Sequence, residues 1–243
     1  MPRLEALRGE FAVLARLVRG MPRAGSHAQA LGAFYGAQSA HYDRFRERLL
    51  QGRAELVAGV ELRERAHVAE LGGGTGRNIE FFGERAARIA RYDVVDLCAP
   101  LLARARERGR AFPQLHAIEA DATTWQPSAP VDAVILSYAL TMIPDWRAAV
   151  ANAVSMLAPG GVLAVVDFHV SPARAAPGAA QHDAFTRRFW PLWFRHDGVR
   201  LDPAHLPALR DALPSHAVVE ARAAVPYLPF VRVPHYRFVG RKT

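Results

Sequence analysis

The sequence predicts an α/β fold: a doubly wound, mostly parallel sheet of seven strands with helices on both faces. Five short apolar runs alternate with helical stretches, and strands joined by crossover helices form parallel sheets. A glycine-rich turn follows the first run, and two strand-like runs near the C-terminus predict a closing hairpin. The expected strands are 66–71, 91–97, 116–121, 131–140, 161–170, 217–225 and 236–241, and the expected helices between them are 76–89, 99–109 and 145–157.

The regions outside this alternation divide the chain. Residues 1–60 are predicted to form an N-terminal helical cap, because apolar residues from Leu4 to Val18 repeat with the spacing of one helical stripe. Residues 61–243 then form the domain that contains the sheet. Within it, residues 171–215 interrupt the alternation and contain a cluster of aromatic side chains. The sequence therefore predicts an insertion before the C-terminal hairpin.

Composition excludes several classes of protein. Of 243 residues, 51% are hydrophobic and 22% charged, so the chain can bury a core and is not expected to be disordered. No apolar run approaches the ~20 residues that span a bilayer, no secretory signal is predicted, and the single cysteine, Cys98, excludes a disulfide framework. A cytoplasmic location is expected. The net charge of +8, almost all from arginine, predicts attraction to phosphates of nucleic acid or of anionic lipid.

The segment Glu-Leu-Gly-Gly-Gly-Thr-Gly (70–76) lies where the first strand should end and a helix begin. Glycines there let the backbone turn sharply and approach a ligand. Their G-x-G-x-G spacing differs from the G-x-G-x-x-G of dinucleotide sites. With the acid before it, the segment resembles motif I of class I S-adenosylmethionine-dependent methyltransferases. The residues expected to hold S-adenosyl-L-methionine here are Glu70, Gly72, Gly73, Gly74, Thr75, Gly76 and Asn78.

Later strand ends supply further cofactor candidates. Asp96 ends the second strand about 20 residues on, where a carboxylate can accept both ribose hydroxyls. Asp121 ends the third strand, where a carboxylate can take the adenine amino group, although aspartates are also common in turns. The fourth strand should reach the cofactor at the carboxyl edge, where open α/β sheets bind ligands. The adjoining residues that complete the predicted cofactor site are Leu97, Ala122, Ser137 and Tyr138.

Motifs that the sequence lacks exclude some classes of methyl acceptor. Ser-Tyr-Ala-Leu (137–140) stands where enzymes that methylate amino groups of nucleic acids usually have N/D-P-P-Y/F. Cys98 follows the second strand, outside the loop where cytosine-C5 enzymes have their nucleophile. The ten histidines show no metal-ligand spacing, so no metal is expected. No nucleic-acid partner is expected either.

Several segments resemble the N-methyltransferase part of betaine-lipid synthases. The more particular features are a Tyr-Asp pair at Tyr42, the Ser-Tyr-x-Leu-x-Met-Ile-Pro stretch from 137 to 144, and the aromatic cluster from 189 to 194. The sequence departs from the family at His169 and His235, where aromatic residues are common. The similar segments are 34–53, 70–80, 94–102, 136–146, 165–171, 189–201 and 234–242.

The resemblance implies three successive N-methylations of the homoserine headgroup of diacylglycerylhomoserine, which give a trimethylated betaine lipid. It implies a lipid-headgroup substrate, an anionic membrane surface as partner, and a separate aminocarboxypropyl transferase that supplies the substrate. The expected location is cytoplasmic, peripherally associated with the inner face of the membrane. Tyr42 is expected beside the cofactor, and residues 171–215 are expected to form the acceptor pocket.

The implied reaction suggests catalytic candidates. A primary amine is largely protonated near neutral pH, so a nearby base or apolar surroundings must favour its neutral form. Asp167 and His169, two residues apart on the fifth strand, face one side and are candidates to act as a base or to orient the acceptor. Tyr138 is the third candidate. Rings that can attract the quaternary ammonium product are Tyr35, Tyr42, Tyr138, Trp190 and Trp193.

Two alternatives stay open. One is a soluble small-molecule methyltransferase of the same fold. The other is a non-catalytic protein that binds the cofactor, or nucleic acid through its basic surface. For each aromatic residue, ordinary core packing is the alternative to a role in binding. The aromatic cluster of the insertion, flanked by arginines, is either a lid that enters the membrane or an internal cap over the cofactor.

Overall fold

The computed structural model describes residues 49–195, 198–225 and 228–243, together with residues 29 and 32. Of the predicted N-terminal cap, the helix described in full is α4 (Arg53–Ala58). The stripe from Leu4 to Val18 lies outside the described residues, as do Tyr35 and Tyr42.

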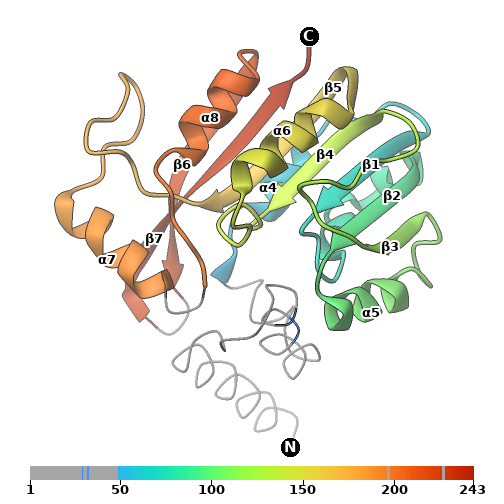
Figure 1. Ribbon diagram of the computed structural model, residues 1–243, viewed down its shortest axis with the longest axis horizontal. Helices are drawn as coiled ribbons and strands as arrows, with labels where there is room; N and C mark the ends of the chain where they lie inside the picture. The colour runs from blue at the N-terminus through green and yellow to red at the C-terminus, as the bar shows by residue number, and fades with distance from the viewer. Residues whose placement is uncertain (1–28, 30–31, 33–48, 196–197, 226–227) are drawn as a thin grey trace, which may run out of the picture.

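A seven-stranded sheet forms the centre of the described structure, in the order β3-β2-β1-β4-β5-β7-β6 (Figure 1). The first five strands in this order pair in parallel, and β7 runs antiparallel to both β5 and β6. The strand order reverses between β1 and β4, which is where ligands bind in open α/β sheets. This arrangement confirms the predicted fold. The strands are β1 (Ala66–Leu71), β2 (Ile89–Asp96), β3 (Leu115–Glu119), β4 (Val131–Ser137), β5 (Leu157–Phe168), β6 (His216–Val225) and β7 (Leu228–Arg241).

Helices cover both faces of the sheet. Side chains of α6 and α8 pack on one face, and side chains of α4, η1, α5 and α7 pack on the other (Figure 1). None of the helices among the described residues is long and apolar enough to cross a membrane. Besides α4, the helices are η1 (Arg77–Arg88), α5 (Ala99–Arg108), α6 (Trp146–Met156), α7 (Ala184–Arg195) and α8 (His205–Ala212).

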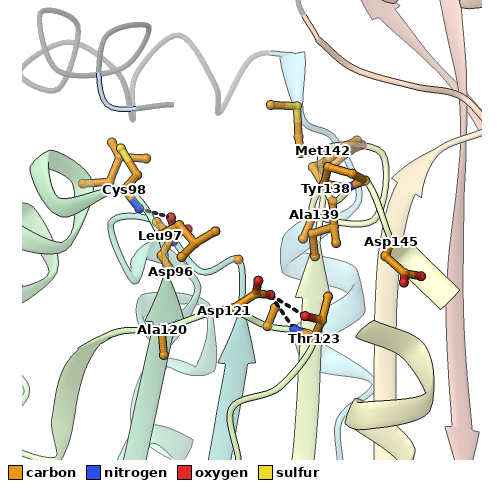
Figure 2. Close-up of a pocket in the computed structure, with 16 residues that line it drawn as sticks. Asp96, Leu97, Cys98, Ala120, Asp121, Thr123, Tyr138, Ala139, Met142 and Asp145 are labelled. Atoms are coloured by element: carbon orange, nitrogen blue, oxygen red, sulfur yellow. Dashed lines mark hydrogen bonds between the residues drawn. The ribbon is translucent and has the colours of Figure 1, made fainter. Parts of the chain in front are cut away.

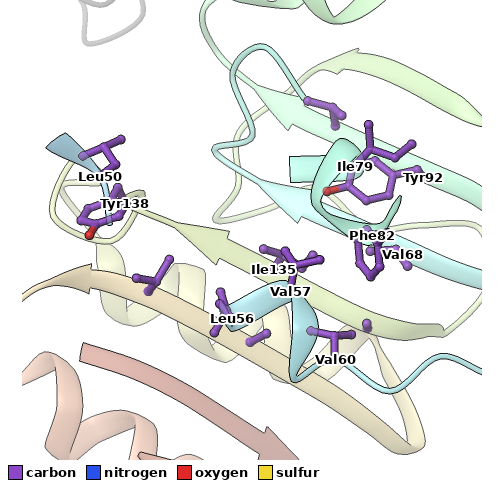
Figure 3. Packing of buried hydrophobic residues seen from close by; sticks show 14 of the residues in the cluster. Leu50, Leu56, Val57, Val60, Val68, Ile79, Phe82, Tyr92, Ile135 and Tyr138 are labelled. Atoms are coloured by element: carbon purple, nitrogen blue, oxygen red, sulfur yellow. The ribbon is translucent and has the colours of Figure 1, made fainter. Parts of the chain in front are cut away.

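The centre of β4, from Ala133 to Leu136, is apolar without interruption because it is covered on both faces of the sheet. Ala133 and Ile135 point to the face of α4, whereas Val134 and Leu136 point to the face of α6, and all four are fully buried. A strand covered on both faces needs apolar residues at every position. Figure 3 shows Ile135 packed close to Val57 at the end of α4.

The first predicted crossover helix differs from expectation. Residues 77–88 form 3₁₀ turns rather than an α-helix, and Gly83 breaks them with φ 55° and ψ −133°. Only glycine adopts that conformation readily. A periodicity of apolar residues cannot separate two short 3₁₀ segments from one α-helix, because both present a stripe.

The C-terminal hairpin is confirmed, but β7 begins earlier than predicted. The proline-rich segment before 236 belongs to β7 and pairs with β6. This pairing runs from Arg222 opposite Pro234 to Val225 opposite Leu228. Pairing of β7 with β5 begins only where Phe168 meets His235. Residues 228–233 thus pair with β6 only, and Pro234 lies where pairing with β5 ends, its carbonyl oxygen accepting a hydrogen bond from the His169 N–H (3.0 Å). A proline, which has no N–H, is tolerated at such a position.

The C-terminal residues close the end of α6. The Lys242 ammonium donates hydrogen bonds to the carbonyl oxygens of Val154 (3.0 Å), Ser155 (3.3 Å) and Leu157 (2.7 Å). The last carbonyls of a helix have no partner within the helix, and a cation there also interacts favourably with the helix dipole. The only lysine of the sequence therefore satisfies a helix terminus.

Candidate active site

A cavity of about 260 Å³ lies at the carboxyl ends of the central strands, where the strand order reverses. Figure 2 shows the residues after β2 on one side and those after β4 on the other. Ligands of open α/β sheets bind at this position. The cavity is lined by Gly72, Gly74, Asp96, Leu97, Cys98, Leu101, Ala120, Asp121, Ala122, Thr123, Tyr138, Ala139, Met142, Ile143, Pro144 and Asp145.

The glycine loop forms the floor of this cavity. The Gly72 N–H donates to the Val95 carbonyl (2.8 Å), which ties the loop to β2. Gly72 has φ 65° and lies so close to the next strand that an added Cβ would be 2.7 Å from the Ala139 Cβ. Gly74 has φ 56°, and its Cβ position faces Leu101 and Asp96, which also line the cavity. Both positions therefore need glycine, as the sequence predicted.

Asp96 holds the loop and faces the cavity (Figure 2). Its Oδ2 accepts a hydrogen bond from the Gly74 N–H and its Oδ1 accepts one from the Cys98 N–H, both at 2.8 Å. A carboxylate oxygen has two lone pairs, so these bonds orient the group without exhausting its acceptors. Asp96 is thus suited to accept hydroxyl donors from a ligand.

Glu70 lies beneath the loop rather than in the cavity. It is 2% exposed and accepts hydrogen bonds from Asn78 Nδ2 and from the Tyr92 hydroxyl, both at 2.7 Å. Burial raises the pKa of Glu70 to about 7, although these two hydrogen bonds lower it in part. Glu70 and Asn78 therefore position the loop from below, and neither lines the cavity.

The third strand end supplies Asp121 and Ala122. Asp121 Oδ1 accepts hydrogen bonds from the Thr123 N–H (2.8 Å) and the Thr123 hydroxyl (2.7 Å), which is the geometry of an Asx turn. Asp121 also lines the cavity, as Figure 2 shows. The turn and the predicted binding role are therefore compatible, because the turn uses only one of its two carboxylate oxygens.

Tyr138 forms the opposite wall with an unusual backbone. Its φ is 54°, which is rare for a bulky residue and is found more often at functional sites. The Tyr138 hydroxyl donates to the Gln51 carbonyl (2.7 Å), and its ring lies 4.7 Å from that of Phe168. Ser137, one residue earlier, is buried and does not line the cavity.

The structure places Asp167 behind the cavity wall. Its Oδ1 accepts from the Thr141 hydroxyl and the Phe168 N–H, both at 2.8 Å, and its Oδ2 accepts from the Thr141 N–H (3.1 Å). Burial raises the pKa of Asp167 to about 6. The carboxyl group thus fixes the loop after β4, which carries Met142, and does not line the cavity itself.

His169 is turned toward α8 and β6. Its Nε2 is 3.1 Å from Glu220 Oε2, and its ring lies edge-on to that of Tyr236. Burial, followed by the charges of His182 and Arg210, lowers the pKa of His169 to about 4, so the imidazole is neutral near pH 7. Asp167 lies at the end of β5 and His169 just beyond it, and neither of these candidate bases lines the cavity.

Of the predicted site, the structure brings seven residues to the cavity: Gly72, Gly74, Asp96, Leu97, Asp121, Ala122 and Tyr138. Six predicted residues do not line the cavity. They are Gly73, Thr75 and Gly76, which belong to the glycine loop, together with Glu70, Asn78 and Ser137. Among the proposed ammonium-binding rings, Trp190 is buried and Trp193 is half-exposed on α7. The lining residues that the sequence prediction missed are Cys98, Leu101, Ala120, Thr123, Ala139, Met142, Ile143, Pro144 and Asp145.

The residues of the cavity fit S-adenosyl-L-methionine. Asp96 is oriented to accept ribose hydroxyls, the left-handed glycines allow close approach of a ligand to the backbone, and Leu97, Ala122 and Met142 offer apolar contact for an adenine ring. The three ionisable carboxyl groups of the cavity also suit a ligand that carries a sulfonium and an ammonium.

Comparison with known proteins agrees with this geometry. Residues 68–161 match a family model described as a methyltransferase domain. A trans-aconitate 2-methyltransferase of Azoarcus sp. (strain BH72) is 34% identical over 124 residues, which are 51% of this chain and 47% of that protein. The chain thus spans about half the length of the curated relatives it matches.

Solved structures share the fold. An O-methyltransferase family protein from Burkholderia thailandensis aligns with a TM-score of 0.65 at 17% identity, covering 100% of this chain and 71% of that one. The 1,6-didemethyltoxoflavin-N1-methyltransferase of the same organism, solved with S-adenosylhomocysteine, aligns with a TM-score of 0.59 at 18% identity, covering 91% and 92%.

The fold and the site thus define the class: a Rossmann-like methyltransferase fold. Residues 68–161 match a methyltransferase domain, and the cavity that these residues line fits S-adenosyl-L-methionine as the methyl donor.

Proposed function

We propose that the protein is an S-adenosyl-L-methionine-dependent N-methyltransferase whose acceptor is the amine of a lipid headgroup, diacylglycerylhomoserine. The observation that carries the choice of an amine over an acid is that no basic side chain among the described residues lines the cavity. Its charged side chains among the described residues are Asp96, Asp121 and Asp145, with no arginine, lysine or histidine. Carboxylates favour a cationic ligand and raise the cost of an anionic one.

Methyl transfer to an amine asks little of the protein. The bound cofactor supplies an electrophilic methyl group on a sulfonium. The chain must hold the amine nitrogen in line with that group, exclude water, and leave the nitrogen lone pair free. Asp96 and the glycine loop hold the cofactor side, and Tyr138 presents an aromatic wall that can attract the cationic product.

The lipid part of the proposal has separate support. It rests on the resemblance of several segments to the N-methyltransferase part of betaine-lipid synthases. A homoserine headgroup carries a carboxylate as well as an amine, and a second cavity of about 630 Å³ contains two arginines, Arg222 and Arg237. Gln51 lines this second cavity and accepts the hydrogen bond of Tyr138, which lines the first, so one hydrogen bond joins the walls of the two cavities.

The second candidate is a methyltransferase that acts on a small carboxylic acid. Its support is the match to trans-aconitate 2-methyltransferases over about half the chain, together with the same basic groups of the second cavity. Here the carboxylate would be the acceptor rather than an anchoring group, and no vesicle would be needed.

One experiment separates the candidates. The full-length protein is incubated with S-adenosyl-L-methionine and either diacylglycerylhomoserine in vesicles or trans-aconitate, and products are resolved by mass spectrometry. We expect stepwise mono-, di- and trimethylated lipid and no methyl ester. Methyl ester alone would refute the proposed acceptor, and turnover of neither would refute both candidates.

A further inference from the structure

The helix α7 exposes large apolar side chains. Phe185 is 71%, Leu192 73% and Trp193 50% exposed, and these are three of the four large hydrophobic residues that the described part of the chain exposes. The fourth, Val219, lies on β6. Isolated exposed apolar residues are ordinary, but three on one helix form a patch that marks an interaction surface.

The opposite face of α7 is packed into the protein. Thr186, Trp190 and Phe194 are buried, and the Phe194 ring stacks on Phe168 with centroids 4.5 Å apart. Phe168 in turn contacts Tyr138 at the cavity wall. The buried face therefore holds α7 in place, and the opposite face of the helix is exposed to solvent.

Positive charge accompanies the exposed apolar residues. Arg188 and Arg195 are exposed on α7, the helix contains no acidic residue, and neither arginine forms an ion pair with the described residues. Arginine with tryptophan and phenylalanine on one helix is the composition of helices that lie in the interface of an anionic bilayer. In Figure 1, α7 lies at the outer edge of the molecule, away from α6 and α8.

We propose that the outer face of α7, formed by Phe185, Arg188, Leu192, Trp193 and Arg195, docks on an anionic lipid bilayer. The apolar side chains would enter the boundary between headgroups and acyl chains, and the arginines would contact lipid phosphates. This inference deepens the proposed function, because it names the surface by which an enzyme of lipid headgroups meets its substrate. Charge complementarity favours a bilayer over a second copy of this basic chain.

The test measures binding of the full-length protein to vesicles by co-sedimentation and tryptophan emission. Vesicles contain phosphatidylcholine alone or mixed with phosphatidylglycerol. We expect the combined change Phe185→Ser, Leu192→Ser and Trp193→Ser to weaken binding to anionic vesicles about tenfold or more. The matched control, Val219→Ser, should bind like the unchanged protein.

A second pair of variants tests the charge. The double change Arg188→Glu and Arg195→Glu should reduce binding to anionic vesicles about tenfold, whereas Arg106→Glu with Arg110→Glu, two exposed arginines on and after α5, alters the net charge equally and should cost much less. Equal losses from both pairs would refute a specific face. Unchanged binding of the triple serine variant would do so as well.

The same proteins distinguish this proposal from the proposed function. Turnover of glycerylhomoserine, which lacks acyl chains, needs the active site but no membrane, and should be unchanged in the variant with Arg188→Glu and Arg195→Glu. Vesicle binding without turnover of either substrate would refute the function and leave the docking face intact. Turnover without vesicle binding, or a dimer that the triple variant dissociates, would refute the docking face.

Discussion

At the scale of single residues, Asp96 shows how one carboxylate serves the loop and the ligand. It accepts two backbone N–H groups and faces the cavity. Replacing Asp96 by Asn keeps the shape but removes the charge and one acceptor oxygen. We expect the affinity for S-adenosyl-L-methionine to fall about 10- to 100-fold, since a hydrogen bond to a charged group contributes ~1.5–3 kcal/mol.

Titration calorimetry measures this change. Asp211→Asn, at an exposed position of α8, is the control and should bind the cofactor normally. If Asp96→Asn bound as tightly as the unchanged protein, the assignment of the cavity to the cofactor would be wrong.

Gly72 and Gly178 separate the two ways in which an added side chain destabilises the protein, namely backbone strain and steric collision. Gly72 has φ 65° and an added Cβ would be 2.7 Å from the Ala139 Cβ, whereas Gly178 has φ 79° and nothing within 4 Å. Gly178→Ala should therefore lower the free energy of unfolding by about 1 kcal/mol, from backbone strain alone. Gly72→Ala should cost about 1–3 kcal/mol more, because of the collision with β4's continuation.

Urea unfolding of both variants checks the difference. Equal midpoints for Gly72→Ala and Gly178→Ala would show that the strands move apart easily at the cavity floor, contrary to this expectation.

The sequence prediction included the cavity-lining residues at the strand ends but missed much of the remaining lining. Asp96 and Asp121 were found because each follows a recognisable strand. Glu70 and Asn78 were placed beside the cofactor because spacing does not tell which way a side chain points, and both point into the core. Met142 and Asp145 were missed because they follow a turn whose path depends on Asp167.

At the scale of elements, the sequence predicted a strand boundary correctly where neighbouring residues determine it, and missed it where pairing with a distant strand does. The bounds of β1 were predicted as found, since a turn of glycines ends it. The start of β7 was missed because prolines normally end strands, and Pro234 is acceptable because it lies where the pairing of β7 with β5 ends. Long-range pairing of this kind leaves no mark in the sequence.

The end of α6 gives a prediction at this scale. Lys242→Met removes the ammonium that binds three carbonyl oxygens. We expect the free energy of unfolding to fall by about 1–2 kcal/mol, from lost charged hydrogen bonds and the lost interaction with the helix dipole. Thermal unfolding measures it, with deletion of Thr243 alone as a control that should have no effect. An unaltered melting temperature for Lys242→Met would contradict the proposed capping.

At the scale of the whole molecule, buried ionisable groups make stability depend on pH in opposing ways. The pKa of Glu70 rises from 4.5 to about 7 and that of Asp167 from 3.8 to about 6, so the folded state holds their protons more tightly. Their contribution is complete at low pH and is lost as pH rises through the folded pKa. His169 and His205, lowered from 6.5 to about 4, act in the opposite direction over pH 4 to 6.5.

A difference measurement isolates Glu70. The free energy of unfolding of the unchanged protein minus that of Glu70→Gln should fall by about 3 kcal/mol between pH 4.5 and pH 8, because the histidines and Asp167 cancel. Glu107→Gln, on the exposed side of α5, controls for the removal of one carboxyl group from the surface. A difference that stays constant with pH for Glu70→Gln would mean that Glu70 is ionised in the folded protein.

Lys242, which binds the carbonyl groups at the end of α6, is the only lysine of the sequence, so reagents that modify lysine side chains react at a single position. Acylating or reductively alkylating reagents meet one target among the side chains of the protein, and that target is engaged by three carbonyls while the terminus stays closed. The rate of modification of Lys242 should therefore depend on how often the helix terminus opens. Labelling at this one site, measured by mass spectrometry, would report the rate of local unfolding at the end of α6.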